Sequence, residues 1–130
     1  MKKFIALFSF ITALTSCSSA QHITQIDQKL DAKDTREIVL EKVINDSRCP
    51  EGVQCIWAGE VTIAVAVYDH QKLIEQTQLT LNPHNQEEII AWFAKRLPKT
   101  KKALQSVVVT PGPSQKKPLD KKDYKIELGY

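Results

Sequence analysis

Alternation of apolar and polar residues predicts several short β-strands in this chain. The clearest is 61–68 (VTIAVAVY), where valine and isoleucine side chains share one face and alanines occupy the other. A strand that is apolar on both faces is typical of a central position, covered on both sides. A three-residue turn joins it to the alternating stretch 72–81, which indicates a hairpin. We expect three further strands, at 35–43, 104–110 and 123–130.

The hydrophobic period becomes helical between residues 86 and 97. The apolar residues at helical spacing are Ile89, Ile90, Trp92, Phe93 and Leu97. This spacing predicts one amphipathic helix. Asn85, with Glu88 three positions later, resembles a capping box, and Pro98 would end the element.

Five strands joined mostly by turns predict a mainly-β fold. We expect a small antiparallel β-sandwich or open barrel of about five strands with one amphipathic helix packed on it. A mixed α+β arrangement is the alternative. The chain has 130 residues, of which 42% are hydrophobic and 25% charged, and such a composition is ordinary for a globular domain. We assign residues 35–130 to a single β-rich domain.

The first residues have the pattern of an export signal. Lys2 and Lys3 precede an apolar run at 4–14, which is too short to cross a bilayer. The next residues, LTSC at 14–17, resemble the lipobox of bacterial lipoproteins. This resemblance implies that residues 1–16 are a lipoprotein signal peptide and that Cys17 carries a palmitate-type lipid anchor.

The same resemblance suggests where the protein resides. Ser18, rather than Asp, follows the cysteine, which implies outer-membrane sorting, facing the periplasm, if the organism has two membranes. Residues 17–34 are expected to be the lipidated cysteine and a flexible tether, because the stretch is polar and lacks periodicity. The formal net charge of +3 falls to +1 without Lys2 and Lys3. A surplus this small does not indicate nucleic-acid binding.

Cys49 and Cys55 remain once Cys17 is assigned to the lipid. Two cysteines in an oxidising compartment predict a disulfide, and Pro50 and Gly52 between them suit a tight loop. Closing this loop would stabilise the fold by about 2 kcal/mol. A metal site is the alternative, but the cysteine spacing is longer than zinc sites use and no histidine lies nearby, so we predict no metal.

Residues 46–59 (DSRCPEGVQCIWAG) form the densest local motif of the chain. They resemble a signature of small bacterial lipoproteins and exported proteins, of the form DSRCP-x-G/D-V-x-C-x-WAG followed by a hydrophobic strand. The resemblance implies a β-rich exported domain over roughly 35–130 and implies no activity. Asp46 and Ser47 suit a side-chain-bonded turn, and Arg48 can pair with Asp46 or with Glu51.

Trp57 has two interpretations. A tryptophan that packs against a disulfide is a recurring core feature of β-sandwiches, so we expect Trp57 in the core. Exposure as a binding anchor is the alternative, because tryptophan is enriched among interface hot spots. We therefore name Arg48, Glu51 and Trp57 as candidate binding residues.

No catalytic signature accompanies these features. The three histidines, His22, His70 and His84, are scattered, and no nucleophile elbow, zinc-protease or phosphate-loop motif occurs. We predict a non-enzymatic binding or interaction module without a cofactor, its partner an envelope protein, glycan or lipid. An enzyme with a dispersed site and a purely structural lipoprotein are the alternatives.

The loop before the last predicted strand is basic; its lysines are Lys116, Lys117, Lys121 and Lys122. We expect this loop to be solvated, and contact with anionic lipid or wall polymer is the alternative.

Overall fold

The computed structural model of the chain describes residues 21–31, 36–114 and 118–130. The predicted signal peptide, the predicted lipid site Cys17, and Lys116 and Lys117 lie outside the described residues. Among the residues described, no helix is both long and apolar enough to span a membrane.

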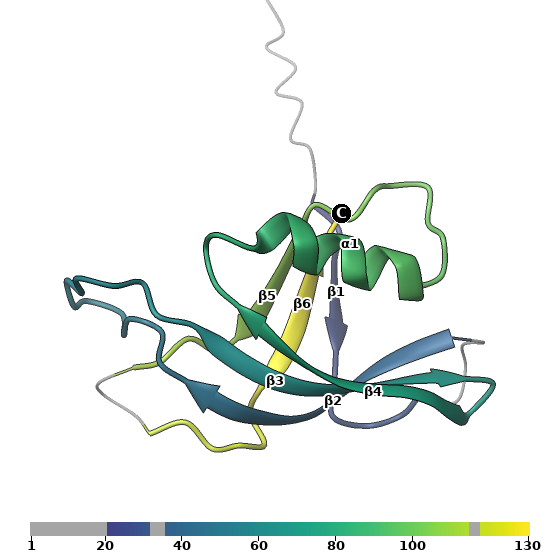
Figure 1. Cartoon of the computed structure of the whole chain (residues 1–130), viewed down its shortest axis with the longest axis horizontal. Coiled ribbons are helices and arrows are strands. Elements are labelled where there is room, and N and C mark those ends of the chain that lie inside the picture. Colours follow the sequence, from purple (N-terminus) through teal and green to yellow (C-terminus); the bar gives the residue numbers. More distant parts are fainter. Residues whose placement is uncertain (1–20, 32–35, 115–117) are drawn as a thin grey trace, which may run out of the picture.

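Two three-stranded antiparallel sheets form the body of the domain. The first has the order β2-β3-β4, with β3 in the centre; its strands are Arg36–Asp46, Val61–Asp69 and Lys72–Leu81. The second has the order β1-β6-β5, with β6 in the centre; its strands are Ile23–Ile26, Lys125–Gly129 and Ser106–Thr110. The strands of the two sheets run across one another, and the sheets do not close into a barrel (Figure 1). The prediction of a mainly-β fold with one helix is confirmed.

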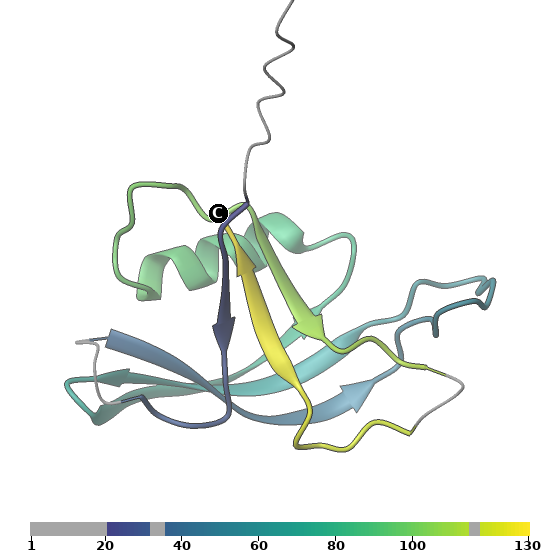
Figure 2. The same ribbon diagram turned by 180° about the vertical axis from the view of Figure 1, so that it is seen from behind.

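The core lies between the two sheets and the helix α1 (Gln86–Arg96). In Figure 1 the helix lies in front of β5 and β6, and in Figure 2 these strands lie in front of the helix. The second sheet therefore has α1 on one side and solvent on the other. Phe93 of α1, Ile63 of β3 and Ile126 of β6 are fully buried where the three layers meet. Their burial removes a large apolar area from water, which is the main force holding the layers together.

Strand β3 is buried on both faces, as its sequence predicts, but the two faces are covered differently. Its valines and isoleucines join the core cluster, whereas Ala64 and Ala66 do not. On the alanine face Gln76 of β4 donates a hydrogen bond to Glu41 of β2 at 2.7 Å, and these strands flank β3 on either side. Small alanine side chains leave room for this bridge. Side chains of the neighbouring strands thus shield the alanine face.

Helix α1 begins where it was expected, but the predicted capping box is wrong. The Asn85 side chain makes no capping hydrogen bond to the first turn. Its Oδ1 accepts the backbone N–H of Asn82 at 3.0 Å, and its Nδ2 donates to the carbonyl of Thr80 at 2.7 Å. Asn85 therefore fixes the connection from β4 to the helix, because both of its polar atoms are taken by the chain that precedes α1.

The end of the helix is fastened to the first sheet. Arg96 forms a bidentate pair with Glu75 of β4 at 2.8 and 2.9 Å, and its guanidinium lies 4.0 Å from the centre of the Trp92 ring. The hydrogen bond from Arg96 lowers the pKa of Glu75. This cluster accounts for the position of Trp92 at the edge of the core.

The domain begins earlier than the sequence predicts. Ile23–Ile26 forms β1, which pairs with β6 over four residues, and Ile26 is buried. The prediction of a tether through residue 34 is therefore wrong for this segment. The error has a physical reason: only Ile26 of the four residues is buried, so β1 has no alternating pattern of its own and depends on β6 for its conformation.

Candidate functional site

Residues 47–60, which carry most of the signature, form a loop that extends the β2–β3 hairpin beyond the sheet. The N–H of Ser47 donates to the carbonyl of Glu60 at 2.8 Å, and that of Cys49 donates to the carbonyl of Ala58 at 3.1 Å. These bonds continue the antiparallel pairing of the two strands. We call this segment the projecting loop, and Figure 1 shows it on the left.

Gly59 allows the two sides of the projecting loop to lie close together. Its φ is +72°, and a Cβ at this position would lie 1.9 Å from the carbonyl oxygen of Ser47. Only glycine fits both the conformation and the contact. Gly59, the last residue of the signature, is therefore required by the shape of the loop.

A disulfide closes the outer part of the projecting loop, as predicted. The Cα atoms of Cys49 and Cys55 are 5.9 Å apart, and the two sulfurs are bonded to each other, so neither is a thiolate available to a metal. Between them the N–H of Val53 donates to the carbonyl of Pro50 at 3.3 Å, with Gly52 at φ +77°. Within the described ranges, no group of three or more histidine, cysteine, aspartate or glutamate side chains could hold a metal ion.

Arg48 anchors the base of the projecting loop. It pairs with Asp46, Nε to Oδ1 at 2.8 Å and a terminal nitrogen to Oδ2 at 2.7 Å. The same guanidinium donates to the carbonyls of Val109 and Pro111, the latter at 2.9 Å. The hydroxyl of Tyr124 donates to Asp46 Oδ2 at 3.0 Å. One ion pair therefore joins the loop to the end of β5 and to the segment before β6.

The electrostatics of this cluster follow from its burial. Burial raises the pKa of the Asp46 carboxyl, but the hydrogen bond and positive charge of Arg48, together with the Tyr124 hydroxyl, outweigh it, so the pKa is lowered. Burial and the hydrogen bond to Asp46 raise the pKa of Tyr124. The aspartate is therefore charged and the tyrosine neutral near pH 7, as their hydrogen bonds require.

These contacts separate the candidate binding residues into those that are paired within the protein and those that are exposed. Every nitrogen of the Arg48 guanidinium donates to an internal acceptor, and its partner is Asp46 rather than Glu51. We therefore leave Arg48 out of the binding surface. Glu51 is exposed, and its backbone N–H donates to the carbonyl of Pro113 at 3.2 Å. Its side chain stays available to a partner.

Trp57 is exposed, so the expectation that it packs in the core against the disulfide is wrong. Its exposed fraction is 82%, and that of the adjacent Ile56 is 93%. The disulfide is at the outer part of a loop that projects from the sheets, which leaves no core beside it for an indole to fill. Sequence reasoning missed Ile56. A signal was available, since two large apolar residues stand together in a loop bounded by Cys55 and Gly59.

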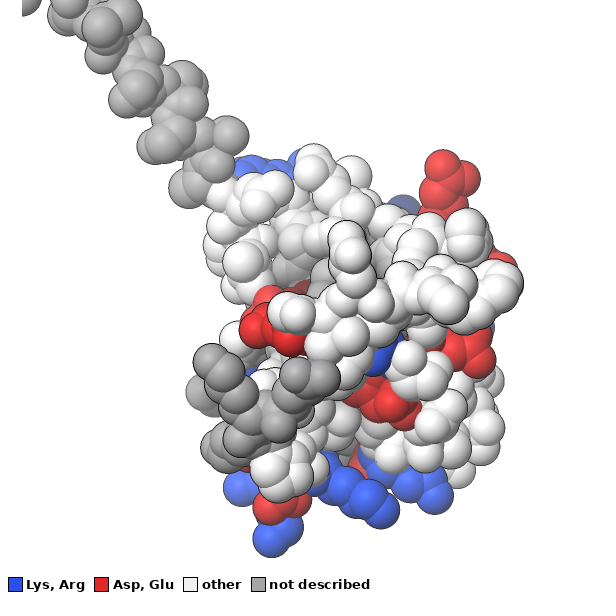
Figure 3. Space-filling view, turned by 90° about the vertical axis from the view of Figure 1, so that its left-hand side faces the viewer, with Lys and Arg blue, Asp and Glu red and all other residues white. Residues whose placement is uncertain are grey.

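We call the exposed side chains of Ile56 and Trp57 the tip of the projecting loop, and the surroundings of this tip are not basic. Figure 3 faces the side toward which the projecting loop extends; its centre is mainly uncharged with acidic patches, and basic side chains gather along the lower edge. The projecting loop itself contains Glu51, Glu60 and Arg48 as its charged residues. Since Arg48 is paired with Asp46, the charges left exposed are acidic.

The histidines do not converge on a site. His70 lies in the β3–β4 turn and contacts Asp69, Nδ1 to Oδ1 at 2.6 Å, and His84 is exposed between β4 and α1. His22 lies beside β1, with its ring near that of Tyr130. Three different parts of the fold therefore carry the imidazoles.

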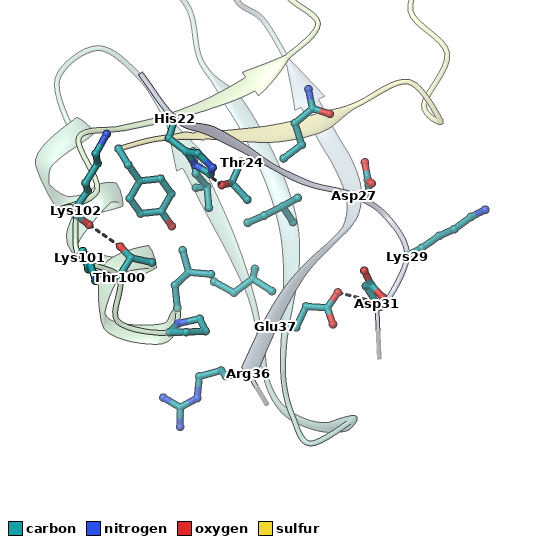
Figure 4. A pocket seen from close by; sticks show the side chains of 17 residues that line it. His22, Thr24, Asp27, Lys29, Asp31, Arg36, Glu37, Thr100, Lys101 and Lys102 are labelled. Carbon is teal, nitrogen blue, oxygen red and sulfur yellow. Dashed lines mark hydrogen bonds between the residues drawn. The ribbon is translucent and has the colours of Figure 1, made fainter. Parts of the chain in front are cut away.

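A cavity of about 650 Å³ lies beside β1 (Figure 4). It is a hollow in the surface, whereas the projecting loop extends outward. Its apolar lining includes Ile38, Leu97, Leu128 and Tyr130, and its rim is polar and charged. Sequence reasoning missed this cavity. No local motif could have revealed it, because β1, β2, the residues after α1 and β6 each contribute only a few positions.

We compared the chain with protein-family models, with curated proteins and with solved structures, and none of them matches it.

Proposed function

We propose that this chain is a lipid-anchored cell-envelope protein that acts as a non-enzymatic binding module, and that Ile56 and Trp57 dock into a protein partner. The anchor rests on the basic, apolar and lipobox segments at residues 2–17. The binding role rests on one observation: two adjacent large apolar side chains, directly after the disulfide-closed ring of residues 49–55, are 93% and 82% exposed.

The construction of the projecting loop supports a docking role. A disulfide, a close glycine contact and a partly buried ion pair hold its backbone. A loop held in this way loses little conformational entropy on binding. Tryptophan is among the residues most often found as interface anchors, since its ring supplies a large contact area with few rotatable bonds.

The chemistry of the tip defines the partner. A partner that binds Ile56 and Trp57 needs an apolar cleft. Basic residues at the rim of that cleft would complement the exposed Glu51 and Glu60. An anionic membrane surface fits less well. Attraction to such a surface depends on clustered lysine and arginine, which the exposed part of this loop lacks.

Crosslinking in intact cells tests this proposal. A photoreactive amino acid at Gln54, next to the tip, is expected to trap a discrete protein, and Trp57→Ala in the same chain is expected to abolish the adduct. Ile74→Ala is the matched control, because Ile74 is also an exposed apolar residue (53%) but lies on the outer strand β4. Adducts with lipid alone, or a protein adduct that survives Trp57→Ala, would overturn the docking role.

The anchor has a separate test. Mass spectrometry of the mature N-terminus is expected to find an acylated peptide that begins at Cys17, and Cys17→Ser is expected to leave unprocessed precursor or to release the protein from membranes. An unmodified mature peptide that starts at another residue would contradict the anchor while leaving the docking test interpretable.

A further inference from the structure

We propose that the cavity beside β1 is a second binding site, and that it takes an amphipathic anion: one apolar chain carrying a carboxylate or a phosphate. The site is separate from the projecting loop. Its volume of about 650 Å³ falls within the range of small-molecule sites, which combine an apolar lining with a few polar groups.

The lining of the cavity suits an apolar chain. Ile38 of β2 and Leu128 of β6 are buried at 2% and 1% exposure, and both line the cavity. Leu97, at the end of α1, and the ring of Tyr130 complete the apolar lining. An alkyl chain placed there would leave water without giving up any hydrogen bond.

The rim on one side supplies positive charge. Lys101 and Lys102 follow Thr100 in the segment after α1, on one side of the cavity (Figure 4). Within the described part of the chain, neither ammonium group makes a hydrogen bond or an ion pair. Two adjacent, uncompensated lysines at the edge of an apolar cavity favour a carboxylate or phosphate.

The opposite rim sets the orientation of the ligand. Glu37 and Asp31 lie across the cavity from the lysines, and one oxygen of Glu37 accepts the backbone N–H of Asp31 at 2.6 Å (Figure 4). Their carboxylates repel an anion. The two cations that line the same part of the cavity, Lys29 and Arg36, point away from it in Figure 4, and Arg36 pairs with Asp69 at 3.4 Å. Asp27, also on the rim, is compensated by Lys125 at 3.4 Å. The anionic end of the ligand therefore lies toward Lys101 and Lys102.

The position of the cavity points to a ligand from the membrane. His22, the second described residue, lines the cavity, and the backbone N–H of Tyr130 donates to its carbonyl at 3.2 Å. Only five peptide steps separate Cys17 from His22, a span of at most roughly 18 Å. This step rests on the proposed anchor, which would hold the mouth of the cavity close to a bilayer that contains such amphiphiles.

Titration with cis-parinaric acid, an intrinsically fluorescent fatty acid, tests the site. The full chain carries Cys17→Ser throughout, so that no covalent acyl chain competes. We expect saturable binding, weakened at least about tenfold by Lys101→Glu with Lys102→Glu. The matched control is Lys121→Glu with Lys122→Glu, the same charge change on two consecutive exposed lysines that do not line the cavity. This control is expected to change the affinity by less than about twofold.

Competition identifies the head group. Palmitate and lysophosphatidate are expected to displace the probe, and the stronger competitor shows whether the site prefers a carboxylate or a phosphate. Non-saturable binding, equal weakening by both lysine pairs, or equal displacement by neutral monopalmitoylglycerol would overturn the proposal. Trp57→Ala is expected to leave parinarate binding unchanged, so failure of this site and failure of the docking role give different results.

Discussion

The base and the tip of the projecting loop are neighbours in sequence but opposite in environment. At the base, the Asp46 side chain is 9% exposed and Tyr124 is 7% exposed, and both are hydrogen-bonded. At the tip, Ile56 and Trp57 are 93% and 82% exposed. A single signature of fourteen residues, 46–59, thus contains the residues that fix the loop and the residues that the loop presents.

This difference shows how a small domain can display apolar side chains on a fixed backbone. The polar residues of the base are partly buried and satisfy one another, which restrains the backbone. The apolar residues of the tip contribute little to the folded state, since they remain in water. Substitutions should therefore affect stability at the base and binding at the tip, and four measurements test this division.

Among substitutions in the projecting loop, the largest loss of stability is expected for Gly59→Ala. The new Cβ would lie 1.9 Å from the Ser47 carbonyl oxygen at a φ of +72°, so the backbone must shift. We expect urea unfolding to show a loss of about 3 kcal/mol. Gly52→Ala is the control: φ is +77° but no atom lies within 4 Å, and the expected cost is about 1 kcal/mol. Equal costs would show that the contact at the base is unimportant.

Arg48→Ala is expected to have the next largest effect. It leaves the Asp46 carboxylate without its main partner and frees the carbonyls of Val109 and Pro111. The expected loss in urea unfolding is about 2–3 kcal/mol. Arg36→Ala is the control, because the Arg36–Asp69 pair is longer at 3.4 Å and more exposed, and its expected loss is below about 1 kcal/mol. A loss for Arg48→Ala no larger than for Arg36→Ala would contradict the anchoring role.

Acid should lower the free energy of unfolding by a smaller amount than these substitutions, through protonation of Asp46 at the base of the projecting loop. The pKa of Asp46 is lowered in the folded state, so the stability that this group contributes is present above its unfolded pKa, near 3.9, and is lost as the pH falls below that value. We expect the free energy of unfolding to fall more steeply between about pH 5 and pH 2.5 in the parent than in Asp46→Asn. Parallel curves for the two proteins would show that Asp46 is not tightly coupled to Arg48.

The smallest effect on stability is expected at the tip. Trp57→Ala should change the free energy of unfolding by no more than about 0.5 kcal/mol, because the indole is 82% exposed. Phe93→Ala, which removes a fully buried ring, should cost about 3–5 kcal/mol by the same measurement. A marked loss for Trp57→Ala would place the indole in the packed structure and remove the reason for assigning it to a partner.

Local patterns in the sequence determined much of the fold. The hairpin of β3 and β4, the helix at 86–96 and the Cys49–Cys55 disulfide all follow from residues close together in the chain. Hydrophobic periodicity reports directly on which face of an element is buried, and six intervening peptide steps already keep the two cysteines near each other.

Tertiary structure decided what depends on residues far apart in sequence. β1 forms because β6, about a hundred residues later, pairs with it, and the cavity exists because four segments meet beside it. The sequence allowed Arg48 to pair with Asp46 or Glu51; contacts with β5 and the following segment fix it on Asp46. Trp57 is exposed because its loop leaves the sheets, and burial, unlike periodicity, is a property of what lies nearby in space.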